Sequence, residues 1–323
     1  MASIEDIKKR IKSIQNTKKI TKAMEMVAVV KMRKAIESVL KTRSYANLSW
    51  LTILNLSQVI KNNNEPLHPL LEKRKEIKKT GVILITSNRG LCGGFNTAII
   101  NKINNAIKKY CIQKGVLEKK TEFILIGKKG AVVYNSFGYN IAADFPKYDI
   151  ISEVKEILPI SQLVIKEYLA KKYDQIFVAY TDYINPTKQL PRVKQLLPID
   201  IIAQDEYLGI VGQDIRLGIK KDFLKEKEEK YLKKDQFIYE YTFEPSPSEV
   251  LDEMLPRLIE VQLFQALLES NASEHSARMT AMHQATKAAG DMVDELTLFY
   301  NKARQASITA EIAEISAGAN AMK

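Results

Sequence analysis

The sequence predicts an α/β protein in which the N- and C-terminal helices form a long antiparallel two-helix coiled coil, with a central Rossmann-like α/β domain between them in the chain. Three observations predict this fold. Both ends carry apolar residues at helical spacing, and short apolar runs alternate with helical stretches between the ends. The ends also differ in charge. Residues 1–60 hold 12 Lys and Arg against 4 Asp and Glu, a net of +8, and residues 246–323 hold 6 against 11, a net of −5.

These patterns divide the chain into four predicted segments. Residues 1–60 form the N-terminal coiled-coil helix, and residues 61–200 form the Rossmann-like domain, with a linker over 61–79. Residues 201–245 are an insertion and return segment, and residues 246–323 form the C-terminal coiled-coil helix.

The N-terminal helix is predicted to run from about Ser3 to about Ile60. Its apolar residues recur at steps of three and four, first at Ile4, Ile7, Ile11 and Ile14. After a phase shift the stripe resumes at Ile20, Met24 and Val27. The pattern predicts one helix with a continuous face for a partner.

The C-terminal helix is predicted to begin with Ser246 as its N-cap, Pro247 in its first turn and Glu249 three residues after the cap. Pro256 is expected to kink it. Steps of three and four predict a seam of mostly small residues, which would let two backbones approach closely: Met282, Ala285, Ala289, Met292, Leu296, Phe299, Ala303, Ala306, Ala310, Ala313 and Ala317.

The same register is interrupted earlier in this helix by polar residues. Traced backwards from Met282, it is broken at Arg278, His275, Asn271 and Arg257. These breaks predict a region where the helix faces something other than its main partner.

The middle of the chain alternates between predicted strands and helices. The strands are predicted over residues 81–87, 121–127 and 174–183. The helices are predicted over 96–114, with Asn96 as N-cap, over 128–137, with Gly138 after it, and over 152–172. This alternation predicts parallel βαβ units with right-handed crossovers. The sequence NPTKQLPR after the third strand is predicted to be a loop.

The glycine-rich stretch TSNRGLCGGFN, residues 86–96, follows the first predicted strand. A dinucleotide site would need G-x-G-x-x-G, but the spacing of Gly90, Gly93 and Gly94 lacks its first part. A P-loop would need Lys and Ser or Thr after the last glycine, where Phe95 and Asn96 stand. Backbone amides could still bind an anion. We predict a structural turn without a nucleotide.

No other catalytic arrangement follows from the spacing. The three histidines are scattered, and neither a Ser/His/Asp nor a Cys/His pattern can be read. We therefore predict no catalytic residue, no cofactor and no metal site. No apolar run approaches the ~18–20 residues of a membrane-spanning helix. Two other functions stay open from the residues alone. The βαβ pattern suits a Rossmann-type nucleotide-binding enzyme, and the basic stretch KKRIKSIQNTKKITK suits a nucleic-acid-binding coiled coil.

Four longer motifs carry a resemblance to a known family. They are IKKRIKSIQNTKKITKAMEMVAVVKMRKA, RGLCGG, ASEHSARMTAMHQATKAA and YNKARQASITAEIAEISAGANAM. Together they closely resemble the gamma subunit of the F-type ATP synthase. The likeness covers both termini and the middle domain and leaves residues 201–235 outside it.

This resemblance implies a non-catalytic rotor subunit in the central stalk of the proton-translocating synthase. The terminal helices would turn inside a ring of three alpha and three beta subunits, and nucleotides would bind that ring. The Rossmann-like domain would lie beside the epsilon subunit and above the membrane ring of c subunits. The chain would couple proton flow to ATP synthesis or hydrolysis and regulate both. It would be a peripheral membrane protein on the cytoplasmic face of a bacterial plasma membrane, with no nucleic-acid partner.

The resemblance also implies contact residues. Arg304 and Gln305 match positions that engage the surrounding catalytic subunits and hold particular angles of rotation, and Met24 lies where the partner helix meets the ring. From the residues themselves, Ile308, Ile312 and Ile315 form a second apolar stripe that would offer apolar contact to the ring. Near the foot of the stalk, the matching positions that approach the membrane ring are Tyr239, Tyr241 and Glu244.

Residues 201–235 depart from the bacterial pattern. Residues 220–235 are predicted to form an exposed helix with Glu and Lys at i,i+4 spacing. This segment contains no cysteines, so a thiol switch there is not expected.

Overall fold

The computed structural model describes residues 4–62, 68–72, 74, 76–114, 121–149, 154–199 and 246–321. Residues 201–235 and the predicted foot residues Tyr239, Tyr241 and Glu244 lie outside the described residues. The chain divides into two compact units. Residues 1–30 and 278–323 form the first, which we name the helix-pair unit, and residues 31–277 form the second, the sheet unit.

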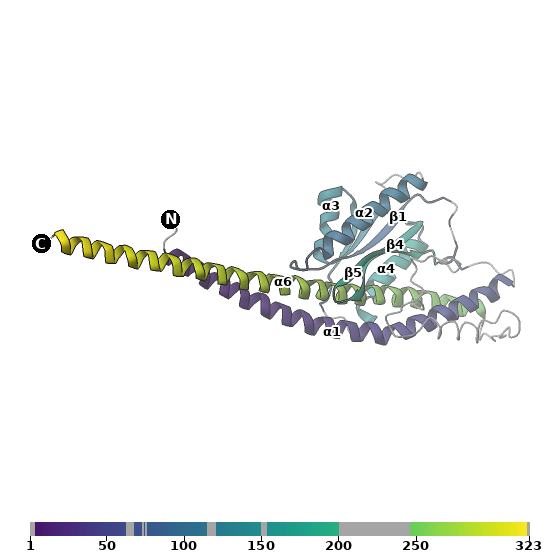
Figure 1. Cartoon of the computed structure of the whole chain (residues 1–323). Coiled ribbons are helices and arrows are strands. Elements are labelled where there is room, and N and C mark those ends of the chain that lie inside the picture. Colours follow the sequence, from purple (N-terminus) through teal and green to yellow (C-terminus); the bar gives the residue numbers. More distant parts are fainter. Residues whose placement is uncertain are drawn as a thin grey trace. The chain divides into compact units, whose positions relative to one another are not determined.

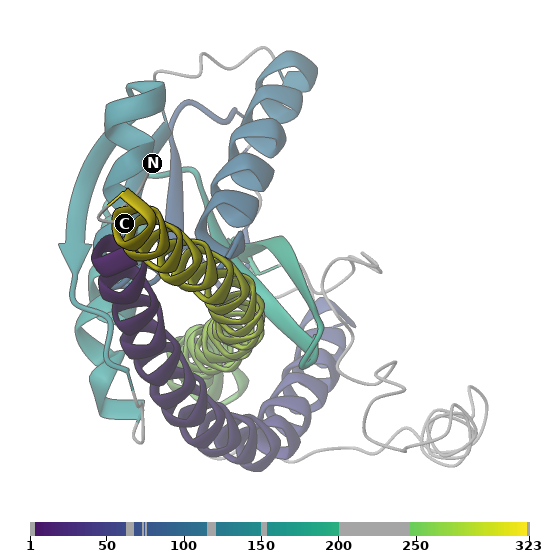
Figure 2. The ribbon, with the colours of Figure 1, turned by 60° about the vertical axis from the view of Figure 1, so that its left-hand side comes forward.

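Two long helices run through both units, α1 (Ile4–Asn62) and α6 (Pro247–Ala321). In the helix-pair unit they lie side by side (Figures 1 and 2). Thr286 Oγ1 donates to Thr21 Oγ1 at 2.8 Å, and His283 Nδ1 lies 3.2 Å from Glu25 Oε1. Residue numbers rise along one helix as they fall along the other. The predicted antiparallel pairing of the two ends is therefore confirmed.

On α1, the face toward the partner differs from the predicted one. Ile4, Ile7, Ile11 and Ile14 are half-buried as expected. Further along, Ile20 and Val27 are 60% and 55% exposed, whereas Ala28 is 1% exposed. The prediction for Ile20 and Val27 was wrong because neighbouring positions are also small or apolar, and hydrophobicity alone did not decide which stripe faces inward.

On α6, the seam departs from the prediction at two positions after Ala289, whereas Leu296 and Ala303 are half-buried as predicted. Met292 and Phe299, which were predicted to face α1, are exposed. Val293 and Tyr300 are half-buried instead. A step of four from Ala289, where the prediction took a step of three, keeps the stripe on the side of α1.

The last turns of α6 extend beyond the start of α1 (Figure 1). Because Thr286 pairs with Thr21, Ile4 lies opposite about residue 303 by the same register. The predicted seam positions after that point do not face α1, and Ala306 is exposed. The alanine spacing correctly predicted that this stretch is helical. It was wrong to place α1 beside the whole of it.

The sheet unit contains a five-stranded sheet in the order β3-β2-β1-β4-β5. The strands are β1 (Thr80–Ile85), β2 (Thr121–Ile126), β3 (Asn140–Phe145), β4 (Gln175–Asn185) and β5 (Lys188–Leu197). The first four are parallel, and β5 is antiparallel to β4. The Rossmann-like alternation is confirmed.

Helices cover both faces of this sheet (Figure 1). Ile83 and Ile85 of β1 pack in one core with α4 (Leu158–Leu169) and the first part of α6. Val82 and Leu84 pack in a second core with α2 (Phe95–Lys114) and α3 (Val132–Phe137). Alternate residues of a strand point to opposite faces, so a strand that is buried on both reads as a continuous apolar run.

Two edge strands were not predicted. Residues of β3 are mostly exposed, so its sequence lacks the apolar run of the central strands. β5 begins in the stretch that was predicted to be a loop, residues 185–192, which contains Pro191. Proline is tolerated in an edge strand, and β5 is one. The side-chain oxygen of Asn185 accepts from the N–H groups of Thr187 and Lys188 at 3.0 and 2.7 Å and closes the β4–β5 turn.

Helix ends agree with the sequence in part. Ser246 Oγ accepts from the N–H of Glu249 at 3.3 Å, as its predicted role as N-cap requires, and α6 continues through Pro256 as one helix. A 3-10 helix, η2 (Lys128–Ala131), precedes α3, and Gly138 ends α3 in the left-handed conformation. The helix predicted over 152–172 is shorter in the structure, because η3 (Val154–Glu156) precedes an α4 that has Pro159 in its first turn.

Candidate functional site

The glycine-rich loop between β1 and α2 is held by hydrogen bonds of its own. The side chain of Asn96 accepts from the N–H of Ser87 at 3.0 Å and donates to Ser87 Oγ at 2.7 Å. Ser87 Oγ in turn donates to the carbonyl of Arg89 at 2.8 Å. Asn96 lies inside α2, so its predicted role as N-cap was wrong; it ties the helix to the strand end instead. The predicted turn from strand to helix is confirmed, and the absence of a nucleotide stays a prediction.

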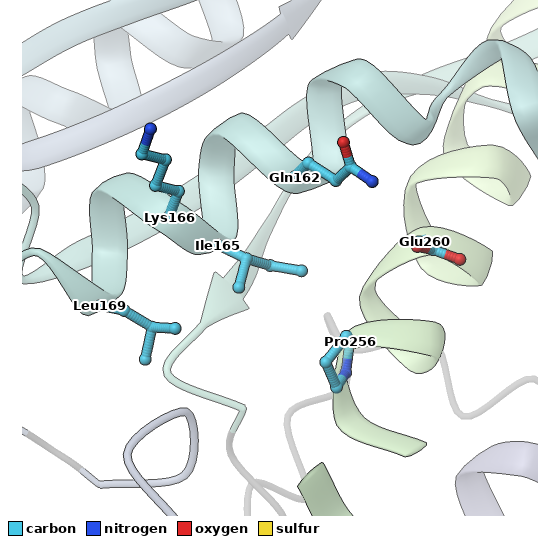
Figure 3. A pocket seen from close by; sticks show the side chains of 6 residues that line it. All are labelled: Gln162, Ile165, Lys166, Leu169, Pro256 and Glu260. Atoms are coloured by element: carbon cyan, nitrogen blue, oxygen red, sulfur yellow. The ribbon is translucent and has the colours of Figure 1, made fainter. Parts of the chain in front are cut away.

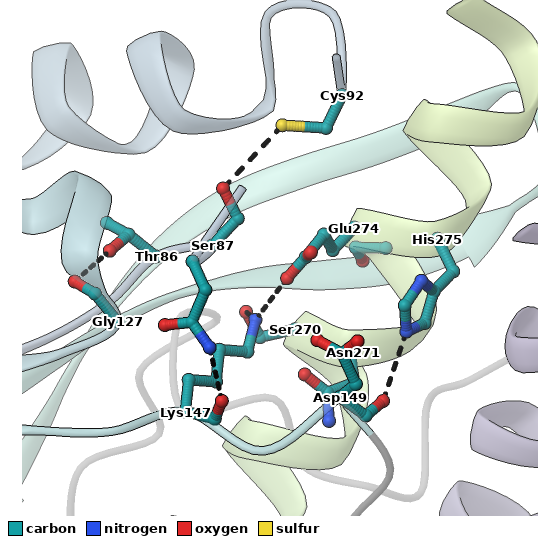
Figure 4. Close-up of polar contacts among 12 residues, drawn as sticks. Thr86, Ser87, Cys92, Gly127, Lys147, Asp149, Ser270, Asn271, Glu274 and His275 are labelled. Atoms are coloured by element: carbon teal, nitrogen blue, oxygen red, sulfur yellow. Dashed lines mark hydrogen bonds and ion pairs between the residues drawn. The ribbon is translucent and has the colours of Figure 1, made fainter. Parts of the chain in front are cut away.

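The same loop leads to a buried ion pair on α6 (Figure 4). Asn88 Nδ2 donates to the carbonyl of Lys147, which follows β3. Lys147 Nζ lies 2.7 Å from Glu274 Oε2, and the two side chains are 2% and 5% exposed. Two charges at this depth are tolerated only because they neutralise each other at close range.

Glu274 belongs to a buried polar stretch of α6, Glu269–Ser276, which we name the polar collar. All eight residues are buried, although only Ala272 is apolar. A surface helix buries one face, so burial of eight consecutive residues means that other elements surround α6 here. The predicted region where the helix faces something other than its main partner is confirmed at Asn271 and His275.

Hydrogen bonds leave the collar in different directions. Toward the segment after β3, Asn271 Nδ2 donates to the carbonyl of Tyr148 at 3.3 Å, and His275 Nε2 lies 3.1 Å from the carbonyl oxygen of Asp149. Toward the sheet, Ser273 Oγ donates to the carbonyl of Thr181 in β4 at 3.0 Å. Toward the β4–β5 turn, Ser276 Oγ donates to the carbonyl of Pro186 at 2.7 Å.

Charged residues also lie on the two strands β4 and β5. Asp182 of β4 pairs with Arg192 of β5 at 2.9 Å. Burial lowers the pKa of Lys194 to about 8, against the attraction of Glu269 in the collar, which favours its charged form. The charge of Glu269 on α6 therefore favours the charged form of a lysine on β5.

Helix α1 is tied to the same segment. Lys31 Nζ lies 2.6 Å from Asp149 Oδ2. This hydrogen bond is the largest of the effects on the Asp149 carboxyl, and together with the nearby positive charges it lowers its pKa despite partial burial. Sequence reasoning did not single out Lys147 or Asp149, because nothing in a linear pattern places a loop residue against a helix more than a hundred positions away.

The predicted ring-contact residues divide into two groups. Arg304 and Gln305 are exposed on the last turns of α6, and Ile308, Ile312 and Ile315 beside them are 47%, 62% and 73% exposed. The structure brings these five together. Met24 is half-buried on α1, close to the register of His283. It therefore lies about 30 Å from Arg304, given roughly 1.5 Å per helical residue.

The helix-pair unit carries further exposed apolar residues that the sequence did not assign to contact with the ring, and four of them, Ile20, Val27, Met292 and Phe299, were predicted to face the partner helix instead. Large exposed side chains occur on both helices: Ile20, Met26, Val27, Val30, Met292, Leu298 and Phe299. A stretch such as AMEMVAVV holds more apolar residues than one seam needs, and this excess was the available signal. Apolar side chains gathered on an exposed surface indicate contact with another molecule.

A groove of about 530 Å³ lies between α4 and α6 (Figure 3). Gln162 and Ile165 point from α4 toward α6, whereas Lys166 points away. Leu169 and Pro256 complete an open, mostly apolar lining. The groove has the character of a gap between two packed helices.

Among the described residues, no group of three or more His, Cys, Asp or Glu side chains could hold a metal ion. In the same part of the chain, no helix combines the length and the apolar character needed to cross a bilayer.

Comparison with known proteins agrees with a pair of long terminal helices joined to an α/β sheet domain. A family model described as ATP synthase matches residues 3–322. The ATP synthase gamma chain of Maridesulfovibrio salexigens is 37% identical over 323 residues, which cover the whole of both chains.

Two solved structures share the fold at lower identity. A chain of the Euglena gracilis mitochondrial ATP synthase, solved with OSCP, F1 and c-ring in rotational state 3, is 17% identical with a TM-score of 0.59. The match covers 99% of this chain and 94% of that one. A chain from the central stalk and c-ring of the Tetrahymena thermophila mitochondrial enzyme is 21% identical with a TM-score of 0.57, over 82% of this chain and 99% of that one.

Proposed function

The chain belongs to the gamma-chain family of ATP synthases, and we propose that it is the shaft whose rotation couples ion flow through a membrane sector to catalysis in a ring of alpha and beta subunits. As a gamma chain it is a central-stalk subunit of an F-type ATP synthase and a non-catalytic part of that complex. This membership replaces the two other interpretations of the sequence, a Rossmann-type enzyme and a nucleic-acid-binding coiled coil.

One observation carries the proposal: the two ends of the chain form an antiparallel helix pair that exposes large apolar side chains, and the last turns of α6 have no partner helix among the described residues. Two paired helices resist bending better than one. Exposed apolar side chains such as Met292, Leu298 and Phe299 can contact a surrounding ring without fixed hydrogen bonds. Contacts of this kind are non-directional and permit rotation.

We assign the holding of particular angles to the end of α6. Arg304 and Gln305 are exposed polar residues next to an apolar stripe of Ile308, Ile312 and Ile315. A charged or amide hydrogen bond to a ring subunit would form at some angles of rotation and break at others, whereas the isoleucine contacts change little. Met24 would contact the ring at a separate level.

The partners and location follow the same proposal. The structurally similar chains were solved in a central stalk with a c-ring and in an F1–c-ring assembly, which supports alpha, beta, epsilon and c subunits as partners. The chain is part of the F1 sector that attaches to the membrane sector. We further propose the cytoplasmic face of a bacterial plasma membrane as its place, a role for Tyr239, Tyr241 and Glu244 near the c-ring, and the division into segments 1–60, 61–200, 201–245 and 246–323.

The function is tested by assembling the chain with alpha and beta subunits and measuring ATP hydrolysis. The isolated chain should hydrolyse no ATP, and the assembled complex should hydrolyse it. Appreciable hydrolysis by the chain alone would contradict a non-catalytic role.

The assignment of Arg304 is tested in the membrane-bound complex. Arg304→Ala should lower ATP synthesis driven by an ion gradient. Lys302→Ala is the matched control, because it removes an exposed cation two residues away on the same helix. Wild-type synthesis in Arg304→Ala, or an equal loss in both variants, would rule out a specific role for Arg304.

A further inference from the structure

Asp149 contacts both long helices. Its carboxylate lies 2.6 Å from Lys31 Nζ of α1. Its carbonyl oxygen lies 3.1 Å from His275 Nε2 of α6 (Figure 4). Lys31 is the first residue of the sheet unit, and His275 lies two residues before its end at Ala277. One residue therefore ties both helices at the positions where they leave the sheet unit.

Lys147, two residues earlier, ties the same segment to α6 through its side chain and to the glycine-rich loop through its carbonyl. Its ammonium group forms the buried ion pair with Glu274 at 2.7 Å and lies 3.5 Å from Ser270 Oγ. Its carbonyl accepts a hydrogen bond from Asn88 of the glycine-rich loop. The segment Lys147–Asp149 thus connects the end of β1 to α6 and α1 through directed polar contacts.

The geometry of such contacts differs from that of an apolar core. In an apolar core the interlocking of side chains opposes the turning of a helix, but the apolar contacts themselves have no preferred direction. Hydrogen bonds weaken steeply when the donor angle falls below about 120°, so they oppose such a turn. Because α6 has hydrogen bonds on several sides, they oppose its turning about its axis in either direction.

We propose that Lys147–Asp149 is the joint through which torque passes between the sheet and the parts of α1 and α6 that lie in the sheet unit, with Lys31, Glu274 and His275 as positioning residues. This inference rests on the proposed function, because torque matters only if the chain rotates. The joint holds the angle of the helices relative to the sheet, in addition to stabilising the fold.

The test is single-molecule rotation of the complex assembled with alpha and beta subunits, with a bead attached through Lys108→Cys on the exposed side of α2. The angular variance of the bead is measured while the complex pauses between steps. Asp149→Asn keeps the size of the side chain but removes its charge. If the ion pair of Asp149 with Lys31 supplies about half of the resistance to turning, its loss should raise the angular variance roughly twofold. The rate of ATP hydrolysis should stay unchanged.

Matched variants separate the joint from general stability. Lys31→Met removes the same ion pair from the other side and should give the same increase. Glu37→Gln removes an exposed pair with Lys41 inside α1 and should leave the variance unchanged. Asp149→Glu keeps the carboxylate and should move the variance back toward that of the wild type.

The two proposals fail in different ways. A wild-type complex that hydrolyses ATP without turning the bead would overturn the proposed function and the joint with it. A wild-type complex that rotates, together with unchanged variance in both Asp149→Asn and Lys31→Met, would overturn the joint alone. Equal increases in Glu37→Gln would also overturn it, because the effect would then not depend on where the ion pair lies.

Discussion

Helix α6 has two regions of opposite character. In the polar collar, Glu269–Ser276, every residue is buried, and directed hydrogen bonds or an ion pair extend to several surrounding elements. From residue 304 to residue 317 every side chain except that of Ser307 is exposed, and the large apolar ones are isoleucines. One continuous helix therefore carries fixed polar contacts where it joins the sheet and exposed apolar side chains where we propose that it meets a ring of other subunits. The difference suits a shaft that must not slip at one end and must turn freely at the other.

The largest effect is expected in the collar, from Lys147→Met. This change removes the cation that neutralises the buried Glu274 carboxylate. Loss of one partner of a buried pair costs roughly 3–5 kcal/mol of unfolding free energy. Urea denaturation of the purified chain measures it. The double variant Lys147→Met/Glu274→Met should recover much of the loss, since no charge is then left buried. A single variant as stable as the wild type would show that the pair is not buried in solution.

The helix pair should show a smaller and strongly position-dependent effect. Ala289 is 6% exposed against α1, so Ala289→Leu should overpack the seam and cost about 1–3 kcal/mol. Ala306 was predicted to lie in the same seam but is exposed, so Ala306→Leu should change stability by no more than about 0.5 kcal/mol. Thermal denaturation of both variants compares them. Equal losses would place the seam where the sequence predicted it.

The smallest effect is expected at a polar contact of α6 outside the collar. His68 Nδ1 accepts from the N–H of Leu70 at 3.1 Å, and its Nε2 lies 2.9 Å from Asp252 Oδ1. Burial lowers the pKa of His68, and the charge and hydrogen bond of Asp252 only partly offset this. The unfolded chain therefore takes up this proton at a higher pH than the folded one, and stability should fall as the pH drops below about 6.5.

Denaturant midpoints at pH 7.5 and pH 5.5 measure this contribution. Asp252→Asn should enlarge the fall, because the carboxylate that favours the charged imidazole is gone. His68→Gln should reduce it. A fall that is the same in all three proteins would assign it to other groups.

The parts of the fold that the sequence predicts well depend on periodicity. The pairing of the termini, the central strands and the strand–helix alternation all follow from apolar spacing. Failures arose where two neighbouring residues were equally apolar, as with Met292 and Val293, or where an edge strand was polar, as in β3. Asn271 and His275 were recognised only as interruptions of a seam. Their partners come from a loop after β3, and no local rule links a loop to a helix so far along the chain.

The exposed residues at the end of α6 are a different case. Arg304, Gln305, Ile308, Ile312 and Ile315 were identified by resemblance and by a second apolar stripe, and their exposure is consistent with a surface contact. Their function depends on other subunits, so the sequence and fold of one chain can place them without demonstrating what they bind.

The most direct test of the account locks the two helices together. Thr21→Cys with Thr286→Cys, in a Cys111→Ser background, places two sulfurs where hydroxyl oxygens lie 2.8 Å apart. If the helix pair turns as one rod, the oxidised complex should rotate a bead attached to the sheet unit at the same rate as the reduced complex. Rotation that stops on oxidation and returns on reduction would show that the helices move against each other, and the account of a single turning shaft would be wrong.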